Sequence, residues 1–288
     1  ILSKEDTDGL ELTWANDRVA FSLIKKIVKR EGIGDVLANG VCRAAREIGN
    51  GAEEYAHHTK KTEYIPSASY LVTPMGALVQ AISDKADPSR NATIFQTAIW
   101  QSTKDIREDY ADSEFCLHPA EYRDHLLSEF DETGWEAEPA CQIAAYDQEL
   151  FCITDLTGLC NFWAGFMPYA PINTRALKAE LISCTTGMDI DEPGLTEIAR
   201  RVINLLRVCN VRLGLKREDD SVSELFFKGS SVSPLQREKV DRQAFEGLID
   251  RFYEIMGWTS EGIPRKDTLE RLNLGYVTQD SKSGEGSA

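Results

Sequence analysis

The sequence has 288 residues, and 47 acidic side chains against 32 basic ones give it a formal net charge of −15. This acidic balance argues against nucleic acid and anionic membranes as partners, because both bind clustered Lys and Arg. No apolar run approaches the ~18–20 residues that a membrane-spanning helix needs, and no signal peptide is visible. Because the first residue is Ile1, we expect a fragment or a processed chain.

The cysteines are scattered, and no Cys-x-x-Cys pair occurs. An odd number of cysteines favours reduced thiols in a cytoplasm over a disulfide framework. The adjacent His57 and His58 cannot point the same way on a helix or strand, so they predict no shared metal site. Cys116 and His118 offer only two ligands, which specify no metal site. The seven cysteines are at 42, 116, 141, 152, 160, 184 and 209.

Two helices are predicted near the start of the chain. Asn16 or Asp17 is expected to cap a helix over 16–30, and Asp35 a helix over 35–48. Apolar residues recur at helical spacing in both, which predicts that one face of each helix packs in a core. In the first helix these residues are Ala20, Leu23, Ile24, Ile27 and Val28.

Further helical periodicity follows, and no segment alternates convincingly with the period of a strand. The strongest pattern, over 195–213, predicts a buried helix with no role beyond the core. We expect an irregular loop over 216–239 and a disordered tail over 279–288. The fold class is therefore all-α. The other predicted helices are a helix beginning at the Pro74–Gly76 turn and helices over 93–104, 119–130, 140–151, 174–183 and 242–256.

The segment from Asp155 to Trp163 carries the most distinctive chemistry. Gly158 allows a close approach of the backbone, and Asp155 is a short acceptor for an amine- or amide-rich ring. Cys160 would need a metal or a positive charge to persist as a thiolate. The alternative interpretation is a turn with a buried, inert cysteine.

Asp155-x-x-Gly158-Leu159-Cys160 resembles the pterin- and cluster-binding motif of the tungsten-containing aldehyde:ferredoxin oxidoreductase family. Four other stretches resemble the same family in the same order: 30–38, 60–63, 216–220, and Gly257-Trp258 leading to Gly262-Ile263-Pro264. The resemblance covers only the C-terminal part of such an enzyme. It implies the C-terminal part of a middle helical domain at 1–59, a C-terminal helical domain at 60–278 and a tail at 279–288.

The resemblance also implies a function. Asp155, Gly158 and Leu159 would hold the pterin of a tungsten or molybdenum bis-pterin cofactor, and Cys160 would be a metal ligand in a 4Fe-4S cluster. The other three cluster cysteines are absent from the sequence, so we expect this chain alone to be inactive and to hold no cofactor. The expected partners are the missing N-terminal domains and ferredoxin or another low-potential carrier, with a homodimer possible.

The implied reaction is oxidation of an aldehyde to a carboxylic acid. One alternative is reduction of an aromatic acyl-CoA of the benzoyl-CoA type, and another is a helical scaffold without catalysis in isolation. Where the family places a histidine close to tungsten, this sequence has Val79, followed by Gln80. Valine cannot transfer a proton, so we expect that group to come from elsewhere, and we assign no catalytic residue. An apolar Val79 would favour a dry pocket suited to a planar ring.

Overall fold

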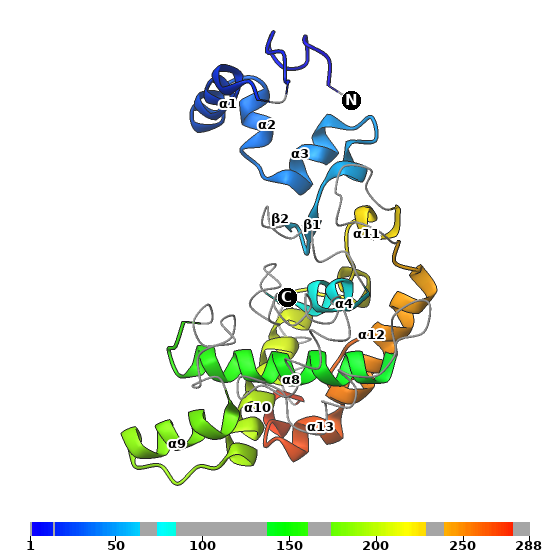
Figure 1. Ribbon diagram of the computed structural model, residues 1–288. Coiled ribbons are helices and arrows are strands. Elements are labelled where there is room, and N and C mark those ends of the chain that lie inside the picture. Colours follow the sequence, from blue (N-terminus) through cyan, green and yellow to red (C-terminus); the bar gives the residue numbers. More distant parts are fainter. Residues whose placement is uncertain are drawn as a thin grey trace, which may run out of the picture.

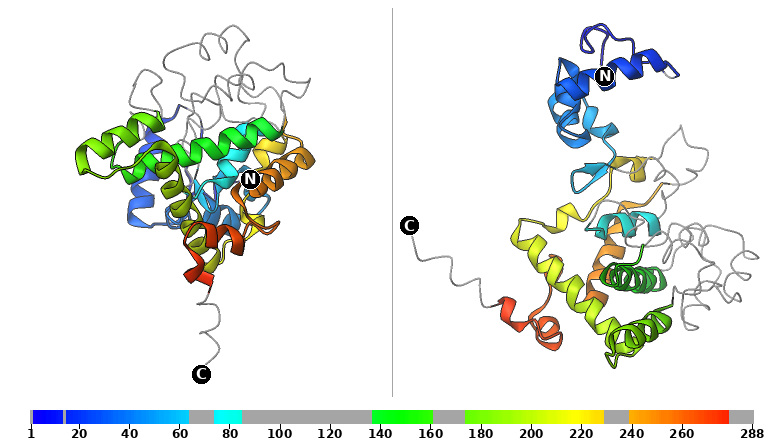
Figure 2. Two further views of the ribbon diagram at one scale, coloured as in Figure 1. Left: turned by 90° about the horizontal axis from the view of Figure 1, so that it is seen from below. Right: turned by 90° about the vertical axis from the view of Figure 1, so that its left-hand side faces the viewer.

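The computed structural model describes residues 2–13, 15–63, 74–84, 137–160, 174–228 and 239–278. These residues are almost entirely helical, and the strands among them are two short ones, which confirms the all-α prediction. Figure 1 shows α1 to α3 gathered at one end of the molecule and α8, α9, α10 and α13 at the other, and the right-hand view of Figure 2 agrees. Within these ranges every helix is too short or too polar to span a bilayer.

The first helix, α1 (Asp17–Lys29), begins where the sequence predicts. The Asn16 side chain accepts a hydrogen bond of 3.2 Å from the Val19 backbone N–H and so caps the helix. The prediction that its apolar face is buried is wrong. The helix has no buried residue, and Ile24 and Val28 are 54% and 78% exposed, because α1 packs chiefly against α2.

The helix predicted over 35–48 is two helices, α2 (Ile33–Leu37) and α3 (Val41–Ile48). Gly40 separates them with a φ of 85°, a left-handed conformation that glycine adopts readily and that breaks a helix. Asp35 does not cap a helix as predicted. It lies inside α2, and its carboxylate pairs with Arg30 at 2.9 Å.

A 3-10 turn, η1 (Ala52–Tyr55), leads to the hairpin of β1 (His58–Thr59) and β2 (Thr62–Glu63). Thr59 pairs with Thr62, so the loop has only two residues, Lys60 and Lys61. Their φ values of 48° and 68° are those of a type I′ turn, whose twist matches that of the strands. This turn aims the tip of the hairpin at the C-terminal half of the chain.

The main core lies between α4 (Pro74–Ile82), α8 (Ala137–Leu156) and α12 (Arg242–Met256). Figure 1 shows α12 crossing beside α8 and α4. The ends of α12 are as predicted. One of its faces is buried, and Trp258 extends that face by packing edge-on against Phe252 at 5.9 Å. The buried apolar residues of α12 are Phe245, Leu248, Ile249, Phe252, Tyr253 and Met256.

Two further helices pack against α8 or against each other: α9 (Arg175–Thr186), capped by Thr174, and α10 (Glu192–Arg212). The prediction that α10 serves only the core is wrong. Its buried face includes Asn204 and Arg207, whereas Leu213, expected inside, is 86% exposed.

Short elements complete the described chain: η6 (Arg217–Asp219), α11 (Glu224–Lys228), α13 (Lys266–Arg271) and η7 (Gly275–Thr278). The irregular loop predicted from 216 is therefore wrong where η6 and α11 form. An ion pair of 2.9 Å between Lys228 and Glu54 joins α11 to η1. The helices predicted over 93–104 and 119–130, Cys116, His118 and the tail at 279–288 lie outside the described residues, and the domain boundary at 59/60 stays a prediction.

Candidate functional site

The predicted motif forms the C-terminal end of α8. The helix continues to Leu156, beyond the predicted end at 151, so Asp155 lies in its last turn and not in a loop. The Leu159 N–H donates to the Thr154 carbonyl at 3.2 Å, and the Gly158 N–H donates to the Asp155 carbonyl at 3.1 Å. These two hydrogen bonds define a Schellman cap, in which Gly158 takes the left-handed position with a φ of 71°.

Asp155, Gly158 and Cys160 are exposed at this helix end, and Leu159 is partly exposed. The alternative of a buried cysteine is therefore wrong. A Cβ at Gly158 would meet no atom within 4 Å, so no neighbouring atom requires glycine here. The positive φ is the reason for the glycine. The cap thus leaves a carboxylate and a thiol exposed at one helix end, which backbone hydrogen bonds hold in place.

The base of this cap rests on a buried lysine. Lys178, from α9, is fully buried, and its Nζ donates to the Thr154 hydroxyl at 2.8 Å. That hydroxyl donates in turn to the Leu150 carbonyl at 2.9 Å. Burial, together with the nearby Arg175 charge, lowers the pKa of Lys178 to about 8. Lys178 therefore links α9 to Thr154, whose carbonyl accepts the hydrogen bond from Leu159 in the cap.

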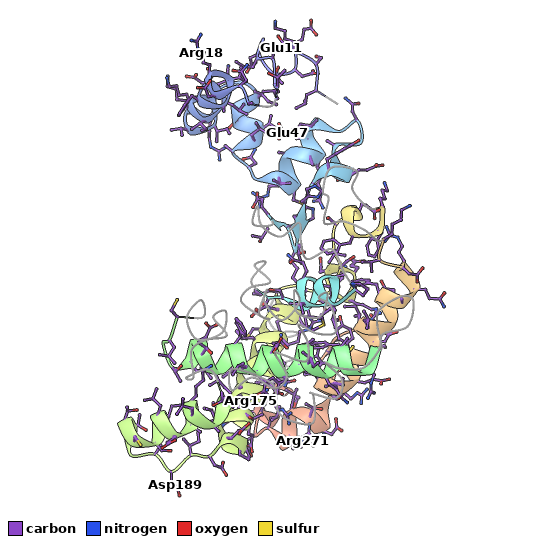
Figure 3. All side chains as sticks on the ribbon, in the orientation of Figure 1. Glu11, Arg18, Glu47, Arg175, Asp189 and Arg271 are labelled. Carbon is purple, nitrogen blue, oxygen red and sulfur yellow. The ribbon has the colours of Figure 1, made fainter. Side chains whose placement is uncertain are left out.

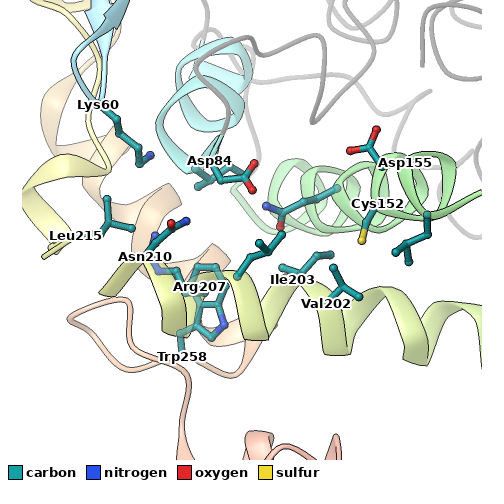
Figure 4. Close-up of a pocket in the computed structure, with 14 residues that line it drawn as sticks. Lys60, Asp84, Cys152, Asp155, Val202, Ile203, Arg207, Asn210, Leu215 and Trp258 are labelled. Atoms are coloured by element: carbon teal, nitrogen blue, oxygen red, sulfur yellow. The ribbon is translucent and has the colours of Figure 1, made fainter. Parts of the chain in front are cut away.

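Asp155 also lies at the edge of a cavity of about 140 Å³. Figure 4 shows side chains converging on it from α8, α10, the end of α4 and the β1–β2 hairpin. Its wall combines apolar side chains with carboxylates, amides and two cations. The lining residues are Lys60, Ile82, Asp84, Gln148, Cys152, Asp155, Leu156, Val202, Ile203, Leu206, Arg207, Asn210, Leu215 and Trp258.

One wall of the cavity is held by a buried ionic network centred on Asp220. The Lys60 Nζ lies 2.8 Å from one carboxylate oxygen of Asp220, and an Arg207 nitrogen lies 2.6 Å from the other. The Tyr253 hydroxyl donates to the same carboxylate, and the Arg207 Nε donates to the Gly262 carbonyl at 2.7 Å. The network therefore joins the hairpin, α10 and α12 beside the cavity.

Burial and charge oppose each other in this network. Burial alone would raise the pKa of the Asp220 carboxyl, but the Lys60 and Arg207 charges together hold that pKa below its ordinary value. Burial lowers the pKa of Lys60, although Asp220 acts in the other direction. Burial, together with Asp220, raises the pKa of the Tyr253 hydroxyl. Asp220 therefore remains a carboxylate at neutral pH.

Gln148 gives the cavity an unused hydrogen-bond acceptor. Its side chain is only 8% exposed, and its Oε1 has no hydrogen-bond partner in the described part of the chain. A buried acceptor without a donor costs free energy, so such a group indicates a site where a ligand or water donates to it. Together with Asp84 and Asp155 it gives the cavity acceptors suited to a planar ring rich in N–H groups.

The structure does not bring Val79 and Gln80 to this cavity. Both lie within α4 and are almost completely buried, and only residues 82 and 84 from this segment line the cavity. Across the described ranges, no three His, Cys, Asp or Glu side chains come together as a possible metal site.

Sequence reasoning missed Lys178, Gln148, Arg207 and the Lys60–Asp220 pair. Lys60 and Asp220 fall within two of the stretches that carried the family resemblance, which was the one available signal. Nothing in the spacing of Gln148 or Lys178 distinguishes them from other helical residues.

Comparison with known proteins gives these features a context. The sequence profile described as "Aldehyde ferredoxin oxidoreductase, domains 2 & 3" matches residues 1–274. The chain belongs to this family. It is 28% identical over 98% of its length to a protein from Pyrococcus furiosus named "Aliphatic sulfonate oxidoreductase, WOR-like subunit", of which the match covers 38%.

A further relative and a solved structure are also similar to the chain. The chain is 25% identical over 95% of its length to the tungsten-containing aldehyde ferredoxin oxidoreductase of Pyrococcus furiosus, and the match covers 40% of that protein. Among solved structures it is similar to one chain of the active site complex BamBC of benzoyl coenzyme A reductase in complex with 1,5-dienoyl-CoA. That match has a TM-score of 0.77 and 28% identity, and it covers 97% of this chain and 42% of the other. The chain thus spans about two fifths of the length of these relatives and corresponds to the C-terminal domains of the family.

Proposed function

We propose that this chain is the C-terminal part of a tungsten (or molybdenum) bis-pterin oxidoreductase and that the end of α8 binds one pterin. One observation carries the proposal: the Schellman cap leaves Asp155 and Cys160 exposed at the end of α8, and Asp155 lines a cavity that contains the unpartnered acceptor of Gln148. Carboxylate and amide oxygens accept hydrogen bonds, and a pterin ring is rich in N–H donors, so these side chains fit the group.

Each residue then has a defined task. Asp155 accepts from the pterin amino and ring N–H groups, with Gly158 and Leu159 shaping the backbone beneath the ring. The buried Lys178 fixes Thr154 and so positions the cap. Cys160 supplies one thiolate of a 4Fe-4S cluster, whose three other ligands come from outside this chain. When bound, the metal–pterin group and the cluster supply the two-electron redox chemistry and the path for electrons.

The proposed reaction is oxidation of an aldehyde. The aldehyde carbon gains an oxygen from water and loses its hydrogen. This conversion to a carboxylic acid releases two protons and two electrons, and each of two ferredoxins accepts one electron. A second candidate is reduction of an aromatic acyl-CoA, favoured by the TM-score of 0.77 to a chain of the benzoyl-CoA reductase complex. The cytoplasmic location, the homodimer and the contact with N-terminal domains belong to the same proposal.

The cluster assignment is tested with a matched pair of cysteines in the full-length protein. Cys160→Ala should lose or degrade the iron–sulfur cluster, because a thiolate ligand is removed. Cys184→Ala removes another exposed thiol, from α9, and should leave the iron content unchanged. Iron analysis and electron paramagnetic resonance spectra measure both. A Cys160→Ala protein with the full iron content and an unaltered spectrum would contradict the assignment.

The substrate is tested separately. Full-length protein is assayed with short aliphatic aldehydes, aromatic aldehydes and aromatic acyl-CoA thioesters, using a low-potential dye. We expect turnover of an aldehyde. Turnover of the thioester alone would replace aldehyde oxidation by the second candidate, and absence of tungsten and molybdenum from the active protein would refute both.

A further inference from the structure

A second cavity, of about 350 Å³, lies between α8, α9, α10, α12 and α13. It shares no lining residue with the cavity beside Asp155, although α8 and α10 contribute to both. Three arginines from three different helices surround it: Arg175, Arg200 and Arg271. Figure 3 labels two of them, Arg175 and Arg271, close to where α10 meets α13.

The carboxylates in this cavity do not balance the arginines. Glu149 pairs with both Arg175, at 2.8 Å, and Arg200, at 2.6 Å. Glu192 is the other carboxylate in the lining. Three guanidinium groups against two carboxylates leave one positive charge in excess.

Two groups in the cavity keep unused donors. Arg271 has no ion-pair or hydrogen-bond partner in the described part of the protein. Arg175 is only 6% exposed, and its Nε–H is buried without an acceptor there, although its other nitrogens bond to the Tyr146 carbonyl and the Thr196 hydroxyl. The Arg175 guanidinium stacks on the Tyr146 ring at 3.6 Å, which fixes its plane and hence the direction of this free donor.

We propose that this cavity binds a small molecule through an oxyanion, either a phosphate or a carboxylate group, that accepts from Arg271 and from the Nε–H of Arg175. Guanidinium groups bind such oxygens with charge-assisted hydrogen bonds and favourable fork geometry. The ligand satisfies the orphaned donor and neutralises the excess charge. The cavity volume lies within the range of small-molecule sites and exceeds that of a single ion, so the oxyanion is one end of a larger molecule.

The site is tested by isothermal titration calorimetry on the purified full-length protein with inorganic phosphate and, separately, with succinate. Sodium chloride at equal ionic strength is the reference. We expect saturable binding of at least one probe, and the tighter one identifies the group that the site prefers. This readout does not depend on redox activity, so it stands apart from the proposed oxidoreductase function.

Arg271→Gln should weaken that binding about tenfold or more, because it removes a charged donor from the site. The matched control is Arg265→Gln, which removes an exposed arginine at the other end of α13 that does not line the cavity. Arg175→Lys, which keeps the charge but removes the Nε–H, should also weaken binding. The proposal would be overturned if neither probe bound saturably, or if Arg271→Gln and Arg265→Gln weakened binding equally.

Discussion

Replacing Asp220 by asparagine removes the one carboxylate that holds Lys60 and Arg207 together. The Asp220 side chain is completely buried, and the two cations lie 2.8 and 2.6 Å from its oxygens. The asparagine has nearly the same shape, so Asp220→Asn tests the charge and not the packing. After the change, Lys60 and Arg207 lose the carboxylate that both of them contact.

The expected loss follows from these distances. With an effective dielectric constant of about 20, each ion pair at such a distance contributes ~6 kcal/mol before desolvation is subtracted. Breaking a buried pair by removing one partner costs ~3–5 kcal/mol in measured cases, since the uncompensated charge stays buried. We therefore expect Asp220→Asn to lower the free energy of unfolding by ~3–5 kcal/mol, which corresponds to a fall in melting temperature of ~6–20 °C.

Urea denaturation followed by circular dichroism measures the effect. Glu218→Gln is the control, because it removes a charge two residues away that forms an exposed ion pair of 3.6 Å with Lys216. Such a surface pair contributes ~0–1 kcal/mol. If Asp220→Asn were no less stable than Glu218→Gln, the network would not stabilise the fold and the reasoning would be refuted.

Three further changes test other parts of the structure. Between pH 8 and 9.5 the folded Lys178, whose pKa is about 8, releases its proton, while the same lysine in the unfolded chain keeps it. The free energy of unfolding should therefore rise over this pH range by ~1–2 kcal/mol in the wild type. The rise should be smaller in Lys178→Met. Gly257→Ala should destabilise the protein ~1–3 kcal/mol more than Gly187→Ala in thermal melts. Both glycines have a positive φ, but only a Cβ at Gly257 would clash with a side chain, that of Thr268. Equal losses would contradict this. Phe252→Ala empties a fully buried position of the main core and should cost ~3–5 kcal/mol in urea denaturation, and a loss below that of an ordinary surface substitution would show that the position is not packed as described.

The success of the sequence predictions depended on whether local pattern decided the structure. The helix α12 lies where its apolar periodicity predicted it, and the structure shows why: the capping Asp241, one apolar face and the closing Gly257 all act within the segment. The same rules located α1, but they could not tell that its apolar face, including Val28, would remain exposed. Periodicity shows that a face is apolar, and the arrangement of distant segments decides what covers it.

The candidate site likewise contains residues that the sequence indicated and residues that it could not indicate. Asp155 and Cys160 were found through motif resemblance, whereas Gly158 was interpreted as allowing a close backbone approach and instead ends a helix. Arg207 was missed, because it lies outside the apolar stripe that the periodicity marked and its partner Asp220 comes from a separate segment. Gln148 was missed because an unpartnered acceptor is a property of the folded cavity, and no sequence spacing encodes it.

The hairpin contact at Asp220 also has a consequence for the order of folding. Arg207 and Tyr253 lie 13 and 33 residues from Asp220 along the chain. Closing those loops costs ~2–3 kcal/mol of chain entropy, whereas bringing in Lys60, roughly 160 residues away, costs ~4–5 kcal/mol. The arginine and tyrosine contacts therefore assemble first, and the hairpin docks on a carboxylate that is already in place. On unfolding the hairpin is the first of the three to leave, so its amide hydrogens should exchange with solvent sooner than those of α12.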